Sequence, residues 1–510
     1  MTNQTELFSL LKKYFNYDSF RTGQKEIIDD ILDGKNVLGI LPTGMGKSLC
    51  YQLPALMLEG VSIVVSPLIS LMMDQVKELK ARHFPKVVAI NSFLSYEERK
   101  EIYQQIHQYK LIFVSPELLQ KQEIMHYLKR TIVSLFVVDE AHCISQWGHE
   151  FRPDYLRLTD CLHELNHPTV LALSATATPI VRKEIVDALE LSNVQERIYP
   201  MDRENIAFVI EKVKTDAEKL TIILNWLEKQ PVPTVIYTST RNEAVEIARY
   251  LNSCLSEREI AYYHGGMEQL DRVMIQEQFM NNQIDIICST SAFGMGINKQ
   301  NIRLVIHMHP TKDMESYIQE VGRAGRDGQF STGLLLYTEH DIERDHNLLI
   351  NETLTKQQLT VIFNMLYQMQ SKDNLLPNEK KYENIFQITE SQWVFLYYEF
   401  EKHGIIKKNK IIFNEANWEN GFNFILERVQ ERYAYKRQKL IDMYEWIIED
   451  SCLRKSLYRH FQEGFKTPQF YCCSNCGYSL QKWEIEKQRP SKKQEKLSWQ
   501  EKLKNIMLIE

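Results

Sequence analysis

One short glycine-containing segment carries the side chains and backbone groups that hold a nucleotide phosphate: Leu41-Pro42-Thr43-Gly44-Met45-Gly46-Lys47-Ser48. An apolar run before it predicts a buried strand, and the residues after Ser48 predict the start of a helix. Backbone N–H groups in such a loop surround the β-phosphate of ATP, Lys47 neutralises its charge, and the Ser48 hydroxyl ligates Mg²⁺. Because the strict form of this motif begins with glycine, an ordinary glycine turn before a helix is the alternative interpretation.

Two adjacent carboxylates, Asp139 and Glu140, follow a second apolar run. An acidic residue at the tip of a buried strand can hold magnesium through water, and the next carboxylate can orient or deprotonate the attacking water. A charged pair in a surface loop is the alternative, but it fits poorly after four apolar residues. We therefore predict that Asp139 and Glu140 are the second half of the nucleotide site.

The loop at residues 143–153 is rich in aromatic side chains and follows these acids directly. Trp147 and Phe151 either pack against neighbouring structure or, together with Arg152, stack on nucleic-acid bases and report their presence to the ATP site. Both interpretations stay open.

Arg323 and Arg326 lie in a glycine-bearing segment much later in the chain. We expect a helix there, which would place them one turn apart and let both point into a neighbouring site. They would then stabilise charge that develops on the γ-phosphate, as arginine fingers do. A solvated basic turn is the alternative, which the alternating glycines disfavour.

Four of the nine cysteines fall near one another late in the chain: Cys452, Cys472, Cys473 and Cys476. A cysteine on a helix plus three clustered thiolates can supply a closed four-sulfur zinc site. Unligated thiols are the alternative, and the adjacency of Cys472 and Cys473 strains the expected geometry. The other five cysteines are scattered singly and are interpreted as small core residues.

The elements that must position these groups are short apolar runs alternating with helical stretches, at residues 61–65, 111–114, 135–138 and 170–173 and, after residue 203, at 234–237, 284–287 and 304–307. This alternation predicts doubly wound parallel sheets, whose ligands bind at the carboxyl ends of the strands. Ser66, Ser115 and Thr290 lie in loops at such an edge, so each is a candidate phosphate contact or a turn former.

The totals exclude several classes of protein. A net charge of −6 argues against a protein that coats nucleic acid indiscriminately, although it leaves room for a local basic track. No apolar run approaches the roughly 20 residues of a membrane span, and the first residues lack a signal-peptide pattern. We expect a cytoplasmic protein that does not insert into membranes.

Taken together, these segments resemble the RecQ family of DNA helicases within helicase superfamily 2, in its short bacterial form. The resemblance covers residues 15–340 in the family's order and rests on 20–24, 41–48, 65–75, 139–142, the loop through Trp147 and Arg152, 174–178, 292–299 and 319–328. The apolar residue at Leu41 is usual in that family. Met45 stands where the family usually has glycine.

The resemblance implies an ATP-dependent enzyme that translocates 3′ to 5′ on single-stranded DNA and unwinds duplex in repair, recombination or replication restart. Arg21 and Gln24 would recognise adenine, although from the residues alone Gln24 could equally be a surface amide. His142 and the aromatic loop would couple DNA to hydrolysis. The implied cofactors are ATP, Mg²⁺ and Zn²⁺. The implied partners are single-stranded and tailed duplex DNA, with single-strand-binding protein or recombination factors as further candidates for a monomer associated with the nucleoid.

The implied fold is two RecA-like α/β lobes followed by a smaller, mostly helical region with a winged helix and a zinc module. We expect the divisions 1–202 (ATP-binding lobe), 203–345 (arginine-bearing lobe), 346–420 (winged helix), 421–480 (zinc module) and 481–510 (flexible tail). We expect a hairpin at 405–413 with a basic tip. The tip lacks the aromatic residue with which many relatives separate strands, so the sequence does not show that this hairpin splits a duplex. An RNA helicase, a double-strand translocase and an ATP-switched annealing protein remain alternatives.

Overall fold

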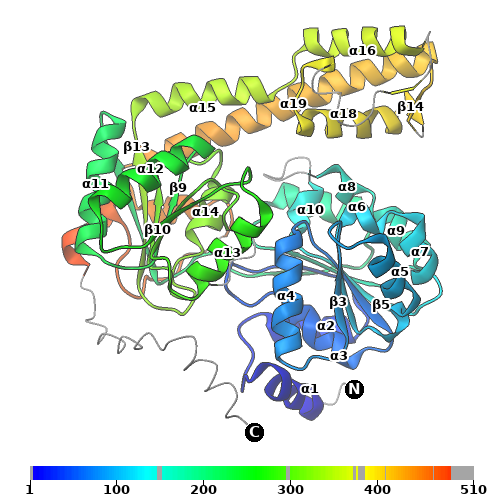
Figure 1. Ribbon diagram of the computed structural model, residues 1–510, viewed down its shortest axis with the longest axis horizontal. Helices are drawn as coiled ribbons and strands as arrows, with labels where there is room; N and C mark the ends of the chain where they lie inside the picture. Colours follow the sequence, from blue (N-terminus) through cyan, green and yellow to red (C-terminus); the bar gives the residue numbers. More distant parts are fainter. Residues whose placement is uncertain are drawn as a thin grey trace.

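The computed structural model describes residues 4–145, 152–294, 299–370, 375–376, 385–407, 409–462 and 464–483. Two α/β lobes lie side by side, and a long helical arm crosses above them (Figure 1). This is the predicted class: two parallel-sheet lobes followed by a mostly helical C-terminal region. No described helix combines the length and apolar character that a membrane span requires.

The first lobe is built on a seven-stranded sheet in the order β3-β4-β2-β5-β6-β1-β7, with every neighbouring pair parallel. Its strands are β1 (Val37–Ile40), β2 (Val61–Val65), β3 (Val87–Ile90), β4 (Leu111–Val114), β5 (Val133–Val138), β6 (Thr169–Ser174) and β7 (Gln195–Ile198). The four residues of β1 and the five of β2 are all buried, as expected for strands covered by helices on both faces. Because β5, β6 and β1 are parallel neighbours, the loops that follow these three strands meet at one edge of the sheet.

Helices cover both faces of this sheet. They are α1 (Gln4–Leu10), the π-helix η1 (Leu11–Phe15), α2 (Gln24–Leu32), α3 (Leu49–Met57), α4 (Ile69–Ala81), α5 (Tyr96–Gln104), η2 (Ile106–Gln108), α6 (Pro116–Leu119), α7 (Gln122–Leu128), η3 (Ala141–Ile144), α8 (Pro153–Leu156), α9 (Leu158–Glu164) and α10 (Pro179–Ala188). Residues 4–32 do not form one continuous helix, because Asn16 and Gly23 adopt left-handed backbone conformations.

The second lobe has a six-stranded sheet in the order β10-β11-β9-β12-β13-β8, again parallel throughout. Its elements are β8 (Ile206–Lys212), α11 (Asp216–Lys229), β9 (Thr234–Tyr237), α12 (Arg241–Cys254), β10 (Ile260–Tyr263), α13 (Gln269–Met280), β11 (Ile286–Ser289), β12 (Leu304–His307), α14 (Met314–Val321) and β13 (Ser331–Tyr337). Strand β8 is an edge strand, which leaves one side open to another segment of the chain.

The C-terminal region is an arm that leaves the second lobe and returns to it. Its elements are α15 (Glu339–Glu352), α16 (Lys356–Gln370), α18 (Glu390–Lys402), β14 (Ile406–Lys407), β15 (Lys410–Ile411), α19 (Glu415–Ile447), α20 (Leu453–Tyr458), η4 (Ser474–Cys476) and η5 (Leu480–Lys482). Helices α15 and α19 run beside each other and carry α16, α18 and the hairpin over the first lobe (Figure 1). An ion pair between Arg157 and Glu401 joins this outer part to the first lobe.

The expected boundaries at 345 and 420 both fall inside continuous helices, α15 and α19. Ile425 and Val429 in α19 belong to the core of the outer helical part, whereas Leu440 and Met443 of the same helix pack on the second lobe. The arm therefore has two cores on one shared helix, and the division into domains stays a proposal.

The expected flexible tail includes Trp483, which the structure instead packs into the second lobe. Trp483 is buried in the core of the second lobe, with its ring 5.9 Å from that of Trp226. Gln230 donates a hydrogen bond to the Trp483 carbonyl at 3.0 Å. The remaining residues of the expected tail, 484–510, lie outside the described residues.

Candidate nucleotide site and cysteine cluster

The predicted phosphate-binding loop connects β1 to α3. Gly44 and Gly46 have φ angles of +82° and +75°, a region that glycine adopts without steric cost, and Ser48 is the N-cap of α3. Met45, between these glycines, is not among the residues with positive φ. The loop thus has the backbone shape and the helix N-terminus that a phosphate group requires.

The carboxylates after β5 lie opposite this loop. Lys47 Nζ is 3.6 Å from Glu140 Oε1, and both side chains are largely buried. Asp139 is buried, and burial together with the charge of Glu140 raises its pKa to about 6. Glu140 itself has a φ of +49°, a strained value for a residue with a side chain, which is typical of functional sites.

This arrangement fits a magnesium–phosphate ligand. Two neighbouring buried carboxylates repel each other, and a divalent cation between them and the phosphates would offset that repulsion. The Asp139 carboxylate also accepts a hydrogen bond of 3.0 Å from the Glu140 backbone, and the Tyr155 hydroxyl donates to the Asp139 carbonyl at 3.2 Å. These contacts hold the pair at the strand end.

The structure corrects the expected placement of the two arginines on a helix. Helix α14 ends at Val321, so Arg323 and Arg326 lie in the turn after it, where Gly325 has a φ of +54°. Their side chains make different contacts. Arg323 is buried and donates to the carbonyl of Gly294 within its own lobe.

Arg326 crosses to the first lobe. A β-carbon on Gly44 would lie 3.1 Å from Arg326 Cγ, so this arginine lies directly against the phosphate-binding loop. Burial, and then the charges of Arg323 and Arg203, lower the pKa of Arg326 to about 9. Positive groups from both lobes therefore concentrate at this loop, and a bound polyanion would relieve their mutual repulsion.

The expected adenine-recognition residues contact the same loop. Gln24 is buried and donates hydrogen bonds of 3.0 Å to the carbonyls of Met45 and Gly46, while Arg21 donates to the carbonyl of Gly44. Gln24 is therefore not the surface amide that the residues alone left open. Recognition of adenine by Arg21 and Gln24 stays a proposal.

Arg203 is a residue of this site that sequence reasoning missed. It lies in the segment between the lobes, and its guanidinium donates to the carbonyl of Thr43 at 3.0 Å and to that of Gly322 at 3.2 Å. The Thr43 hydroxyl also donates to the Gly322 carbonyl at 3.1 Å. Because these contacts join residues far apart in sequence, no local pattern marks Arg203.

We expect a non-hydrolysable ATP analogue with Mg²⁺ to stabilise the protein strongly, because it would neutralise this concentration of positive charge. At about 100 times its dissociation constant the analogue should add about 2.7 kcal/mol to the free energy of unfolding. Thermal denaturation of the wild type, Lys47→Ala and the control Lys35→Ala measures this. The shift should be lost in Lys47→Ala alone; an equal shift in all three proteins would place the ligand elsewhere.

The candidate nucleic-acid contacts differ in how far they are buried. Ser66 and Ser115 are buried, and Ser115 is the N-cap of α6, whereas Thr290 is partly exposed. His142 is buried with Nδ1 2.9 Å from Ser174 Oγ, which links the loop after β5 to the end of β6.

Arg152 donates to the carbonyl of Pro67 at 2.9 Å. Trp147 and Phe151 lie outside the described residues. A cavity of about 360 Å³ opens between the lobes beside these groups, and its lining includes His142, Thr290 and Lys436.

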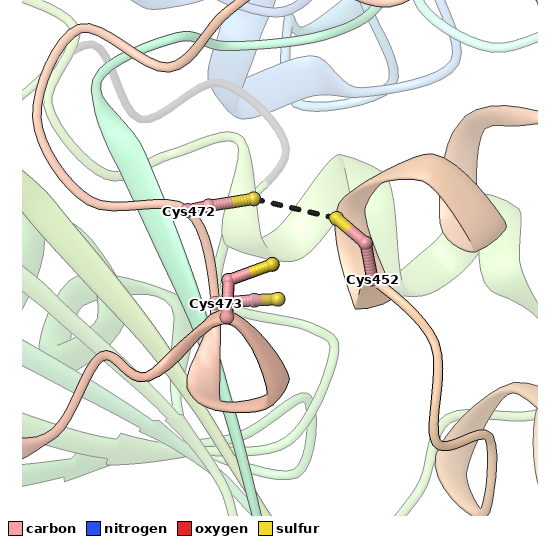
Figure 2. A group of neighbouring side chains, drawn as sticks. Cys452, Cys472 and Cys473 are labelled. Carbon is pink, nitrogen blue, oxygen red and sulfur yellow. Dashed lines mark hydrogen bonds between the residues drawn. The ribbon is translucent and has the colours of Figure 1, made fainter.

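The structure brings all four clustered cysteines together. Their sulfur atoms lie within 4.8 Å of one another, and the Sγ atoms of Cys452 and Cys472 are 3.4 Å apart. Figure 2 shows the thiols of Cys452 and Cys472 turned toward each other with Cys473 beside them, so adjacency of Cys472 and Cys473 does not separate their sulfurs. Four soft sulfur donors this close fit a tetrahedral zinc ion.

Two segments of the chain converge to form this cluster. Cys452 is the N-cap of α20, while Cys472 and Cys473 pair with the free side of β8, where the Phe208 N–H donates to the Cys472 carbonyl at 3.1 Å. Hydrogen bonds to Cys473, then burial, raise the pKa of Cys472, as expected when several thiols share one site without a cation. The cluster thereby fastens the end of the arm to the second lobe.

Two parallel-sheet lobes with a phosphate-binding loop and an arginine turn facing it define a helicase-type ATPase. A DEAD/DEAH box helicase model matches residues 21–185, and a helicase conserved C-terminal domain model matches residues 218–328. In fold, the chain is similar to the Mycobacterium smegmatis helicase Lhr bound to ssDNA and AMP-PNP, with a TM-score of 0.55 and 21% identity over 67% of this chain and 49% of that one.

Relatives in sequence show to which family of helicases the chain belongs. The chain is 38% identical to the "Probable ATP-dependent DNA helicase RecS" of Bacillus subtilis over 99% of both chains. It is 43% identical to the "ATP-dependent DNA helicase RecQ" of the same organism over 66% of this chain and 56% of that protein. The chain therefore belongs to the RecQ family of helicases and is an ATP-hydrolysing helicase.

Proposed function

We propose that this chain is an ATP-dependent 3′–5′ DNA helicase that translocates on single-stranded DNA and unwinds duplex during DNA repair, recombination or replication restart. The observation that carries the proposal is the contact between lobes at the nucleotide site, where Arg326 lies against Gly44 and Arg203 joins Thr43 to Gly322. Because the site is complete only when the lobes meet, closing and opening of the lobes can follow binding and hydrolysis of ATP.

Each residue of the site has a proposed role in that cycle. Lys47 and the loop N–H groups bind the β- and γ-phosphates, and Ser48 and Asp139 hold Mg²⁺, which supplies charge stabilisation to the phosphates when bound. Glu140 orients the attacking water. Arg326 stabilises charge on the γ-phosphate, and Arg323 positions the arginine turn through Gly294.

Coupling to DNA would run through the loops at the same sheet edge. His142 lies between the nucleotide carboxylates and β6, and the aromatic loop begins at the next residue. We propose that Trp147, Phe151 and Arg152 respond to bases, while Ser66, Ser115 and Thr290 support loops that follow the phosphate backbone.

The proposal also includes a metal ion, a cellular location and binding partners. We propose Zn²⁺ at Cys452, Cys472, Cys473 and Cys476, and a cytoplasmic monomer that acts on single-stranded and tailed duplex DNA. Single-strand-binding protein and recombination factors are the proposed protein partners. The winged-helix designation of residues 346–420 rests on α16, α18 and the hairpin β14–β15, whose strands have two residues each.

One feature favours a second function, an ATP-switched annealing protein. The hairpin β14–β15 carries Lys407 and Lys410 and lacks an aromatic wedge. Basic residues alone would hold a strand without splitting a duplex. In this case hydrolysis would reset DNA affinity and would not drive strand separation.

Strand displacement on matched substrates tests the proposal. Duplex DNA with a 3′ tail, with a 5′ tail, and with a 3′ RNA tail of the same sequence is incubated with the wild-type chain and ATP. We expect displacement from the 3′ DNA tail at least about tenfold faster than from the other two, because the lobes would step in one direction along a deoxyribose backbone. Equal displacement from both DNA tails would contradict the proposed 3′–5′ polarity. Faster displacement from the RNA tail would contradict the proposal that the enzyme translocates on DNA.

A further inference from the structure

The segment between the lobes carries one side chain that contacts the backbone of both. Arg203 donates from Nη1 to the carbonyls of Thr43 (3.0 Å) and Gly322 (3.2 Å), and from Nη2 to the carbonyl of Gly325 at 2.6 Å. Thr43 directly precedes Gly44 of the phosphate-binding loop. Gly322 and Gly325 flank Arg323 and lead into Arg326. Arg203 therefore joins the phosphate-binding loop to the arginine turn.

A second arginine fixes the backbone that carries Arg203. Arg454 has no exposed surface; it forms an ion pair with Asp202 and donates to the carbonyls of Arg203 (3.0 Å) and Ile206. These contacts to three of the five residues 202–206 restrict the conformation of this segment.

Arg454 stands in the first turn of α20, two residues after Cys452. The cysteine cluster, which fixes the start of α20, is thus connected through one buried side chain to the segment between the lobes.

We propose that Arg203 is a positioning residue for ATP hydrolysis, which holds the arginine turn of the second lobe against the phosphate-binding loop of the first, and that Arg454 transmits the integrity of the cysteine cluster to this contact. The inference rests on the ATP hydrolysis of the proposed function. Within the described part of the chain, the side-chain hydrogen bonds of Arg203 go to backbone carbonyls and to Asn205, and we therefore place its action on the loop and the turn that carries Arg326.

The chemistry of arginine explains why this residue type is needed. A guanidinium presents five N–H donors in a planar fork, which lets one side chain reach carbonyls on both lobes. An ammonium group is a single point and cannot span Thr43 and Gly325 with the same geometry. Removing the fork would also leave partly buried carbonyls without their charged donor, which is costly only in the closed state.

Because the contact exists only when the lobes meet, its loss should slow turnover and spare nucleotide binding. We expect Arg203→Ala to lower kcat for DNA-stimulated ATP hydrolysis about 10- to 100-fold, the effect of losing a charged hydrogen bond. The dissociation constant of a fluorescent ADP analogue, measured without DNA, should stay within about threefold, because Lys47 and Ser48 remain in place. Arg203→Lys should remain about tenfold impaired.

The connection through Arg454 is tested with Arg454→Lys, which keeps the positive charge. We expect kcat to fall about tenfold while zinc content is retained, and we expect the Arg203→Ala/Arg454→Lys double variant to be no slower than Arg203→Ala alone. The matched control is Arg82→Ala, which removes the arginine that follows α4 and pairs with Glu78; this variant should hydrolyse ATP like the wild type.

The readouts separate the outcomes. If Arg203→Ala keeps kcat within threefold of the wild type, the positioning role is wrong. It is also wrong if ADP affinity falls by the same factor as kcat and the melting temperature falls as well, because the variant would then be damaged as a whole. Additive effects of the two arginine variants would overturn the connection through Arg454. A wild type that does not hydrolyse ATP with oligo(dT) would contradict the proposed function itself. Failure of the proposed function is therefore seen in the wild type, whereas failure of the role of Arg203 is seen in the variants of an active wild type.

Discussion

Glu140→Gln is expected to lower the rate of ATP hydrolysis about 10³-fold while nucleotide and DNA binding persist. The glutamine keeps the shape of the side chain beside Lys47, but it cannot accept a proton from the attacking water, and general-base assistance is worth about 10² to 10⁴ in rate. Steady-state hydrolysis with saturating single-stranded DNA, together with nucleotide affinity, measures the effect.

The control for this substitution is Glu117→Gln, the same chemical change at an exposed position in the same lobe. It should behave as the wild type. If Glu140→Gln hydrolysed ATP at a near-normal rate, another group would have to orient the water. If it lost nucleotide binding as well, the strained backbone at Glu140 would indicate a structural role.

Cys452→Ser is expected to lose about one zinc ion per chain and to lower the melting temperature by on the order of 10 °C. Cys452 joins α20 to the segment on β8, so an unligated cluster would free the end of the arm from the second lobe. Metal analysis and thermal denaturation measure the two effects.

Cys254→Ser is the matched control, because Cys254 is an exposed cysteine of the second lobe away from the cluster. It should keep both zinc and stability. A wild-type chain purified without zinc and indifferent to chelators, or a Cys452→Ser chain that retains the metal, would show that the four thiols do not form the proposed site.

Much of the fold follows from local patterns. Continuous apolar runs predicted the buried parallel strands, and the polar loops that follow them predicted the edge where the phosphate-binding loop and the carboxylates meet. Helix α18 is a clear example, because Thr389 and Gln392 form the capping box that begins it and Gly404, with a φ of +68°, follows its end. Such signals lie within a few residues of the feature that they predict.

The parts that could not be predicted depend on contacts between distant residues. Helix α14 ends at Val321, so Arg323 and Arg326 lie in the turn after it, where Gly325 has a positive φ, and they make different contacts. Arg203, Arg454 and Trp483 acquire their roles only when the linker, the cysteine cluster and the second lobe come together. Likewise, α19 belongs to two cores, which no composition change along the chain marks.

In the proposed function, ATP hydrolysis between the lobes drives strand separation. Its most direct test is displacement of a 3′-tailed DNA duplex, followed alongside ATP hydrolysis in the same reaction, for the wild type and Glu140→Gln. We expect the wild type to displace the strand while it consumes ATP, and the variant to bind the substrate but do neither. A wild type that hydrolyses ATP on this DNA without displacing the strand would show that hydrolysis does not drive unwinding, and would favour a switched annealing protein.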